Sequence, residues 1–351
     1  MNMALRCRLS CILLPFFVLS SSAQSSSPLF PIVQDGKQGY IDRTGKIAIP
    51  PTFDVASFFL DGLALVKTAE VGRHGFEGFS GKFFIRPDGE VAFKQQYDDY
   101  GEFHEGMARV CEEGTGIFSN TKWGFIDTSG KTVVEPSFHR VGDFSEGRAW
   151  VGIRHAFFIF VGRATFGFID HNGNLIIPDR FDGAGNFSEG LANVVVDNKR
   201  GFIDTNGTMI IGPSFDKVGS FSEGLAWIRI GNKCGYIDRE GTLVIDSVFD
   251  DARDFSEGMA LAKQNGQWTY IDRNGRAMFG RSFQGAFPFS QSLAAVLVAG
   301  KWGYIGVTGD LTIDPRFDYA WSFSDGLARV EVNKNWGYID RHGNYVWEPT
   351  H

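Results

Sequence analysis

The chain has 351 residues, of which 43% are hydrophobic and 21% charged, with a formal net charge of −7 at pH 7. This composition is too rich in apolar and aromatic residues for a disordered chain, and it lacks the basic excess typical of nucleic-acid-binding proteins. The counts of 44 Gly and 34 Phe are high for a globular protein and indicate a residue pattern that repeats.

The N-terminal segment has the features of a cleaved export signal. Two arginines within the first eight residues precede an apolar stretch over 12–19, and Ser21–Ala23 offers small residues to a signal peptidase. The apolar stretch is too short to cross a bilayer as an anchor. We therefore expect residues 1–23 to be removed, leaving a secreted or periplasmic mature chain, 24–351.

Charge limits the classes of partner expected for the mature chain, and the cysteine content raises the question of a disulfide. Removal of the leader takes away two positive charges and no negative ones, which disfavours nucleic acids and anionic membrane surfaces as partners. Cys111 and Cys234 remain, and the sequence leaves open whether they pair. Cys234 stands where other repeats carry Trp, which favours a small buried side chain.

A repeated unit organises the rest of the chain. An alignment on the isoleucine of a Gly-Tyr/Phe-Ile-Asp pattern gives nine units, and the last five steps are each 34 residues. An aromatic residue precedes the isoleucine and a Gly follows four positions later in all nine units, and a Phe follows eighteen positions later in the eight units that extend so far. The nine isoleucines are Ile41, Ile85, Ile126, Ile169, Ile203, Ile237, Ile271, Ile305 and Ile339.

Each unit predicts three strands. In the last unit, 327–332 alternates like a half-buried strand, a turn leads into 336–340, and a second turn at 340–343 leads into 344–348. Asp can accept backbone N–H groups at the start of such a turn, and Gly can take the positive φ that it requires. In complete units we expect a Pro to end the third strand, and a connector with two Phe positions to wedge between neighbouring units.

The units resemble the WG-repeat family, also called KWG repeats. The pattern is Lys-Trp-Gly-Phe-Ile-Asp at 122–127, recurs at 301–305 and 335–340, and is trailed by a Phe-Ser-Glu-Gly-Leu-Ala type of segment where the chain continues. The resemblance implies a β-rich repeat module, often on bacterial surface or exported proteins, and no catalytic residues. Thr269 replaces the motif Gly and Lys82 its Trp, so we expect local irregularity in the units of Ile85 and Ile271.

The repeats predict an all-β fold, a repeat array of nine three-stranded antiparallel meanders. One meander cannot bury both faces alone, so stacking of neighbouring units creates the core. A propeller-like ring is favoured over an open β-solenoid, although both protect strand edges by repetition. Against the ring, the chain begins and ends in the same phase of the repeat, with 29–33 matching 327–331, so no blade is visibly shared between the termini.

The recurring carboxylates point to structure more than to chemistry. The turns beginning at Asp170 and Asp272 look like starts of calcium loops, but the remaining ligand spacing is missing. A carboxylate that recurs once per unit is explained by geometry common to all units, whereas catalysis needs a singular environment. No zinc motif or nucleophile turn is present, so we expect no metal, no cofactor and no catalytic residue. The recurring Ser-Glu-Gly carboxylates are Glu146, Glu189, Glu223 and Glu257.

Irregular repeat lengths indicate a candidate binding site. The first three steps are 44, 41 and 43 residues, and all the extra length falls in the same turn of three consecutive units. Such insertions lie side by side on one face of a repeat array, where exposed aromatics and cations can stack on sugars or grip a peptide. A lid in which these loops pack on one another is the alternative. The candidate ligand-binding residues are Arg73, His74, Phe76, Phe79, Phe118, Arg154, His155, Phe157 and Phe158.

Two functions from different classes remain open. The expected one is an exported, non-catalytic binding or scaffold protein that recognises a protein or a cell-envelope glycan through the insertions. The alternative is a hydrolase acting on a glycan or a peptide, whose catalytic residues would come together only in space. Turnover that one carboxylate substitution abolishes would favour the alternative.

Overall fold

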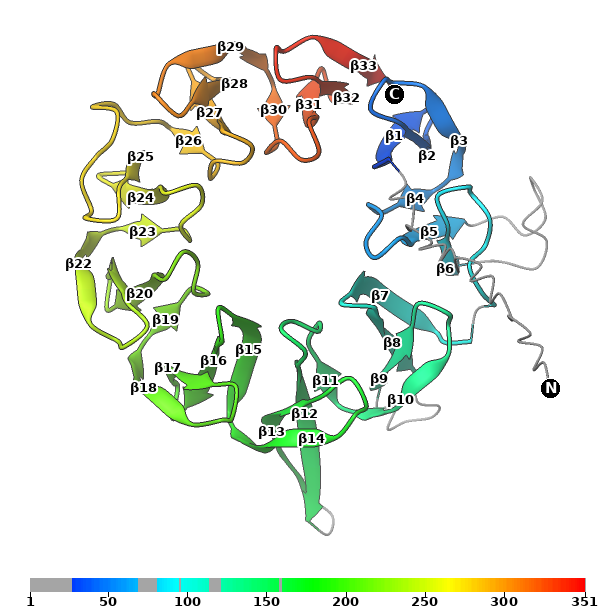
Figure 1. Cartoon of the computed structure of the whole chain (residues 1–351), viewed down its shortest axis with the longest axis vertical. Coiled ribbons are helices and arrows are strands. Elements are labelled where there is room, and N and C mark those ends of the chain that lie inside the picture. Colours follow the sequence, from blue (N-terminus) through cyan, green and yellow to red (C-terminus); the bar gives the residue numbers. More distant parts are fainter. Residues whose placement is uncertain (1–26, 69–80, 95, 114–120, 158–159, 351) are drawn as a thin grey trace, which may run out of the picture.

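Nine small antiparallel sheets follow one another around a ring and form a nine-bladed β-propeller (Figure 1). The computed structural model of the chain describes residues 27–68, 81–94, 96–113, 121–157 and 160–350. In this part of the chain no helix is long and apolar enough to cross a membrane. The prediction of an all-β ring of nine units is confirmed, and the open solenoid is excluded.

A complete blade has four strands, ordered from a short inner strand near the ring axis to a long outer strand at the rim (Figure 1). The three strands that the sequence predicts are the second, third and outer strands. The connector adds an inner strand, two residues long in most blades and six residues long in β7 and β15, which the sequence pattern does not predict. Six blades are complete, the first has no inner strand, and two others have no outer strand within the described residues.

The strands of the first four blades are β1 (Phe30–Gln34), β2 (Lys37–Ile41) and β3 (Ile47–Phe53); β4 (Val55–Ala56), β5 (Ala64–Thr68) and β6 (Gly81–Ile85); β7 (Asp99–His104), β8 (Met107–Glu112), β9 (Lys122–Asp127) and β10 (Thr132–Phe138); β11 (Arg140–Val141), β12 (Ala149–Phe157), β13 (Phe160–Ile169) and β14 (Leu175–Phe181). Those of the last five are β15 (Gly183–Ser188), β16 (Leu191–Val196), β17 (Lys199–Asp204) and β18 (Met209–Phe215); β19 (Lys217–Val218), β20 (Ala226–Ile230), β21 (Lys233–Ile237) and β22 (Leu243–Phe249); β23 (Asp251–Ala252), β24 (Ala260–Gln264) and β25 (Gln267–Ile271); β26 (Gly285–Ala286), β27 (Leu293–Val298), β28 (Lys301–Gly306) and β29 (Leu311–Phe317); β30 (Tyr319–Ala320), β31 (Ala328–Val332), β32 (Asn335–Ile339) and β33 (Tyr345–Thr350).

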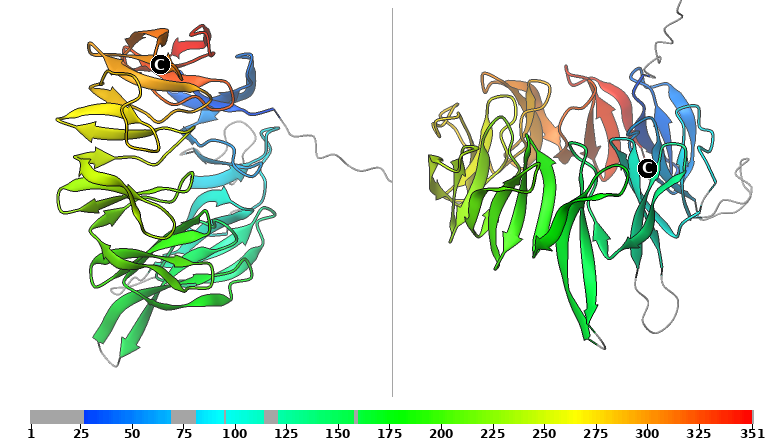
Figure 2. Two further views of the ribbon diagram at one scale, coloured as in Figure 1. Left: turned by 60° about the vertical axis from the view of Figure 1, so that its left-hand side comes forward. Right: turned by 60° about the horizontal axis from the view of Figure 1, so that its bottom comes forward.

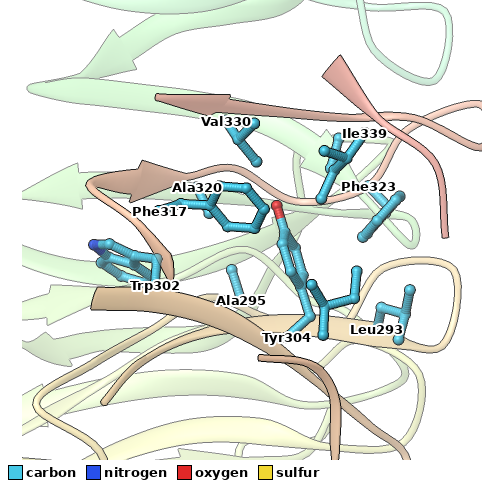
Figure 3. Packing of buried hydrophobic residues seen from close by; sticks show 11 residues of the cluster. Leu293, Ala295, Trp302, Tyr304, Phe317, Ala320, Phe323, Val330 and Ile339 are labelled. Atoms are coloured by element: carbon cyan, nitrogen blue, oxygen red, sulfur yellow. The ribbon is translucent and has the colours of Figure 1, made fainter. Parts of the chain in front are cut away.

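The hydrophobic core lies between successive blades, as the junction of the eighth and ninth blades shows (Figure 3). Tyr304 of β28 points toward the next blade, where its ring lies 4.9 Å from that of Phe323, centroid to centroid. The Tyr304 hydroxyl also donates a hydrogen bond of 2.8 Å to the carbonyl oxygen of Trp321. The connector Phe therefore wedges between units as predicted.

The glycine of the Trp-Gly pair is required because the outer strand crosses directly over it. A Cβ at Gly303 would lie 2.6 Å from the carbonyl oxygen of Ile313 and 2.7 Å from the nitrogen of Pro315. The register shifts at this point, so that β29 contains two more residues than β28 between consecutive pairs. Pro315 lies inside this irregularity, and the strand resumes beyond it. The expectation that the Pro ends the third strand is therefore wrong, because a proline without an N–H group fits at a bulge.

The ring closes through side-chain packing between the last and first blades. Phe30 and Ile32 of β1 share a core with Leu327 and Tyr338. The Tyr338 hydroxyl donates a hydrogen bond of 2.9 Å to the carbonyl oxygen of Pro31. β1–β3 and β30–β33 remain separate sheets. A chain that begins and ends in the same phase can therefore still close into a ring.

The structure settles two points about the cysteines: whether they pair, and whether Cys234 is buried. Cys111 and Cys234 are both buried and free, so they do not form a disulfide. Burial raises the pKa of each thiol, which favours its neutral form. The small buried role expected for Cys234 is confirmed.

Candidate functional site

The insertion of the fourth blade extends two strands of the propeller into a long β-hairpin. β12 and β13 pair from Ala149 with Ile169 out to Phe157 with Phe160. The matching strands of the fifth blade, β16 and β17, end at a two-residue turn after Val196. The hairpin consequently projects beyond the neighbouring blades (Figure 1, Figure 2).

His155 is anchored at the side of this hairpin. Its Nε2 lies 2.5 Å from Oδ2 of Asp179 on β14, and that oxygen also accepts a hydrogen bond of 2.6 Å from the Thr165 hydroxyl. Burial acts to raise the pKa of Asp179, but the hydrogen bonds from Thr165 and His155 outweigh it and lower the pKa. The imidazole ring is nonetheless 58% exposed, so a ligand can reach it. Arg154 is also exposed.

The structure places only part of the predicted site. Arg154 and His155 lie on β12, and the backbone of Phe157 ends that strand. The other candidates lie outside the described residues: Arg73, His74, Phe76, Phe79, Phe118 and Phe158. The first two insertions connect β5 to β6 and β8 to β9, the counterparts of β12 and β13 in adjacent blades. We call the shared end of these three strand pairs the insertion face.

The Ser-Glu-Gly carboxylates join successive blades. Glu189 lies in a two-residue turn with a φ of 52°, and its Oε2 accepts a hydrogen bond of 2.8 Å from the N–H of Gly224 in the next blade. The preceding Ser188 hydroxyl donates to the carbonyl oxygen of Phe221 at 2.7 Å. Equivalent carboxylate bonds come from Asp61, Glu105, Glu146, Glu223 and Glu257. A carboxylate that caps a neighbouring turn has a structural role, which explains its recurrence.

The turn aspartates are likewise committed to the backbone. Oδ1 of Asp272 accepts hydrogen bonds from the N–H groups of Arg276 at 2.8 Å and Asn274 at 2.9 Å. The bond from Arg276 is the main cause that lowers the pKa of Asp272. Asp170 is arranged in the same way. Across the described residues, no group of three or more His, Cys, Asp or Glu side chains is placed to hold a metal ion.

Asp254 differs from these carboxylates. It lies on the connector of the seventh blade, and burial raises its pKa, although Arg253 and Trp227 offset part of this effect. A raised pKa is a property of general acids, so this group is the one that the hydrolase alternative would use first.

Sequence reasoning missed a cavity of about 510 Å³ at the ring-closing junction. It lies where the first blade has no inner strand among the described residues, between the connectors of the blades on either side. The signal was present in the sequence, because the first unit starts at Leu29 without a connector before it. The lining residues are Pro28, Leu29, Phe30, Phe58, Phe59, Leu60, Glu102, Phe287, Trp321, Ser322, Ser324, Asp325, Leu327, Arg329 and Tyr338.

Comparisons with known proteins agree with the repeat and the fold. The profile of the WG containing repeat family matches eight segments, 39–69, 83–115, 123–153, 166–199, 201–234, 235–268, 268–302 and 302–336. Each match runs from the Trp-Gly strand of one blade into the next blade, so nine blades give eight complete matches. No curated protein matches significantly.

Solved structures match the chain at low sequence identity. The crystal structure titled as the eukaryotic initiation factor is 12% identical, with a TM-score of 0.57 over 90% of this chain and 88% of that chain. The crystal structure of AztD from Citrobacter koseri is 14% identical, with a TM-score of 0.41 over 91% of this chain and 92% of that chain. At these identities the first likeness supports the propeller fold and nothing about function.

Proposed function

The chain belongs to the WG-repeat family and closes its repeats into a propeller, and from that premise we propose that it is an exported, non-catalytic binding protein. Its partner is a protein of the cell envelope, held at the insertion face. The observation that carries the proposal is the hairpin of β12 and β13, which extends strands that regular blades join by a two-residue turn.

The edges of the hairpin favour a protein over a glycan. From Ile153 to Phe157 on β12, and from Phe160 to Thr165 on β13, the described strands pair only with each other. An exposed strand edge offers main-chain N–H and C=O groups, which an extended peptide can match by adding a strand. Exposed Arg154 and His155 beside this edge add a positive charge and an imidazole ring for selecting the partner.

A trimmed hairpin tests this function. Replacing residues 155–163 by Asn-Gly should lower capture of the partner from an envelope extract by at least about 10-fold, since the contact surface is lost. The thermal midpoint should change little, because shortening a loop alters closure entropy only slightly. As a matched control, Asp197-Asn198 of the regular fifth blade is changed to the same Asn-Gly turn, which should leave capture intact.

Three outcomes separate the alternatives. Full capture by a stable trimmed protein would remove the partner from this face. Binding to envelope polysaccharide or peptidoglycan, with no captured protein, would replace the protein partner by a glycan. Turnover of a polysaccharide or of peptidoglycan that Asp254→Asn abolishes would favour the hydrolase.

The expectation of export is checked by intact-mass measurement, which should place the start of the exported chain near Gln24.

A further inference from the structure

We propose that the cavity at the ring-closing junction binds a phenylalanine side chain presented by a peptide segment of a second protein. The cavity is separate from the insertion face, so this inference does not depend on that face. It rests on what fills the same place at the eight other junctions of the ring.

At eight junctions a connector Phe packs against the Tyr or Phe of the preceding blade. The ring centroids are 4.8 to 5.1 Å apart in all eight pairs. At the ninth junction Tyr338 has no connector Phe among the described residues, and its neighbour Phe30 approaches edge-on at 5.6 Å. The cavity borders Tyr338 and therefore corresponds to the place of a connector Phe.

The polar groups that receive a connector are also present at this junction. At the preceding junction, the Ser290 hydroxyl donates to the carbonyl oxygen of Phe323 at 2.7 Å, and Oε1 of Gln291 accepts the N–H of Gly326 at 2.9 Å. Ser324 and Asp325 hold these two positions at the cavity. Asp325 reaches Arg43 at 3.4 Å instead of a backbone N–H group, and the Ser324 hydroxyl has no acceptor in the described part of the chain.

These groups suit a peptide more than an isolated aromatic molecule. A serine hydroxyl and a carboxylate beside an aromatic slot match the carbonyl and N–H groups that flank a phenylalanine in a polypeptide. The lining carries two carboxylates, Asp325 and Glu102, against one cation, Arg329, so it offers more charged acceptors than donors to the N–H groups of a peptide. The volume of about 510 Å³ lies within the range of about 300–1,000 Å³ typical of ligand pockets, and leaves room for neighbouring residues.

The register of the repeat indicates that the occupant comes from another chain. Each connector Phe stands four residues before the first residue of the next strand segment, as Phe323 precedes Leu327. In the sequence, the residue four positions before Leu29 is Ser25, so the repeat supplies no Phe at the connector position of the first unit. The walls of the cavity are aromatic, with Phe287 and Trp321 on one side and Phe58, 46% exposed, on the other. Such anchors are typical of protein-binding hot spots.

The first experiment measures binding of a synthetic connector to the purified full chain by titration calorimetry. The peptide Gly-Ser-Phe-Ser-Glu-Gly-Leu-Ala, with blocked ends, copies residues 219–226. We expect it to bind at least about 10-fold more tightly than the same peptide with Ala in place of Phe. Equal affinities, or no binding of either peptide, would overturn the proposal.

Variants then locate the binding. Phe58→Ser and Asp325→Asn should each weaken the peptide by at least about 5-fold, because each removes a group of the lining. Val248→Ser is the matched control, since Val248 is 48% exposed but lies on the rim strand β22, and should leave affinity unchanged. Melting curves confirm that all three variants fold. Unchanged affinity in both cavity variants would overturn the proposal. It would also be overturned if the chain formed a dimer that the peptide dissociates, because a second copy of the chain would then be the occupant.

Discussion

Regular and irregular blades differ at the motif glycine. The fifth blade, β15–β18, is regular, whereas the second, β4–β6, and the seventh, β23–β25, are irregular. In the fifth blade Gly201 lies beneath the outer strand, and a Cβ there would stand 2.3 Å from the carbonyl oxygen of Ile211. The irregular blades carry Phe83 and Thr269 at this position, and neither sheet has an outer strand among the described residues. A side chain at this position is therefore incompatible with the close crossing of the outer strand.

The irregular blades replace the lost contact with an aromatic residue. In regular blades an outer-strand aliphatic residue packs against the turn glycine of the next blade, as Ile177 does at Gly207. In the irregular blades Phe93 and Phe279 take this place, against Gly130 and Gly309. Both Phe rings also lie 5.5 Å from the core aromatic of their own blade. The ring thus keeps its blade-to-blade contact while losing a strand of the sheet.

The largest effect on stability is expected when a side chain is placed at the motif glycine of a regular blade. Gly201→Val should destabilise the protein by about 3 kcal/mol, because the new side chain meets backbone atoms that cannot move without displacing β18. Gly212→Val is the control, since Gly212 lies on the same outer strand and a Cβ there would have no atom within 4 Å, and it should cost less than about 1 kcal/mol. Urea unfolding measures both, and equal midpoints would contradict the crossing argument.

A smaller loss is expected at the turn glycine that contacts the preceding blade. Gly207 has a φ of 82°, and a Cβ there would stand 2.8 Å from Cγ2 of Ile177. Gly207→Val should therefore cost about 2 kcal/mol through backbone strain and crowding together. Gly266→Val separates the two causes, because Gly266 has a φ of 79° but no atom within 4 Å. If both variants melt at the same temperature, the contact between blades contributes nothing.

Restoring glycine at position 269 of the irregular seventh blade tests whether that glycine is sufficient for an outer strand to form. Thr269→Gly should lower stability by about 0.5–1 kcal/mol, since glycine weakens a strand and Phe279 still holds the following segment in its irregular path. Thr269→Ala serves as the control for loss of the side chain. Increased stability, together with slower hydrogen exchange over 277–283, would show that glycine alone determines the outer strand.

Much of this comparison was accessible from the sequence. Thr269 correctly predicted the irregular unit at Ile271, and the recurrent Phe correctly predicted the wedges between blades. The irregular unit at Ile85 was expected from Lys82 at the Trp position, but Arg200 holds that position in the regular fifth blade, and the residue that differs is Phe83 at the glycine position. Most inner strands escaped prediction because a strand of two residues, such as β30, is too short to show alternation. The cavity escaped because it arises where the two ends of the array meet, so the missing connector before Leu29 has to be combined with the last blade, which is far away in the sequence.

The smallest effect concerns the aspartate turn that regular and irregular blades share. Asp204 in the fifth blade and Asp272 in the seventh accept the same pair of backbone N–H groups. For Asp204 burial opposes these bonds without cancelling them, and for Asp272 the bond from Arg276 dominates, so the pKa of each carboxyl is lowered. Asp204→Ala and Asp272→Ala should therefore each cost about 0.5–1 kcal/mol at pH 7.

The pH dependence of that cost identifies the charged carboxylate as its source. A carboxyl with a folded pKa below its unfolded value of about 3.9 binds its proton more readily in the unfolded chain, so its contribution is present above about pH 4. The contribution is lost as the pH falls through the folded pKa. The gap in unfolding free energy between wild type and either variant should thus shrink toward about pH 2. A gap that stays constant with pH would assign the cost to the turn backbone, and a gap confined to Asp204→Ala would mean that the irregular blade does not use its turn as the regular blade does.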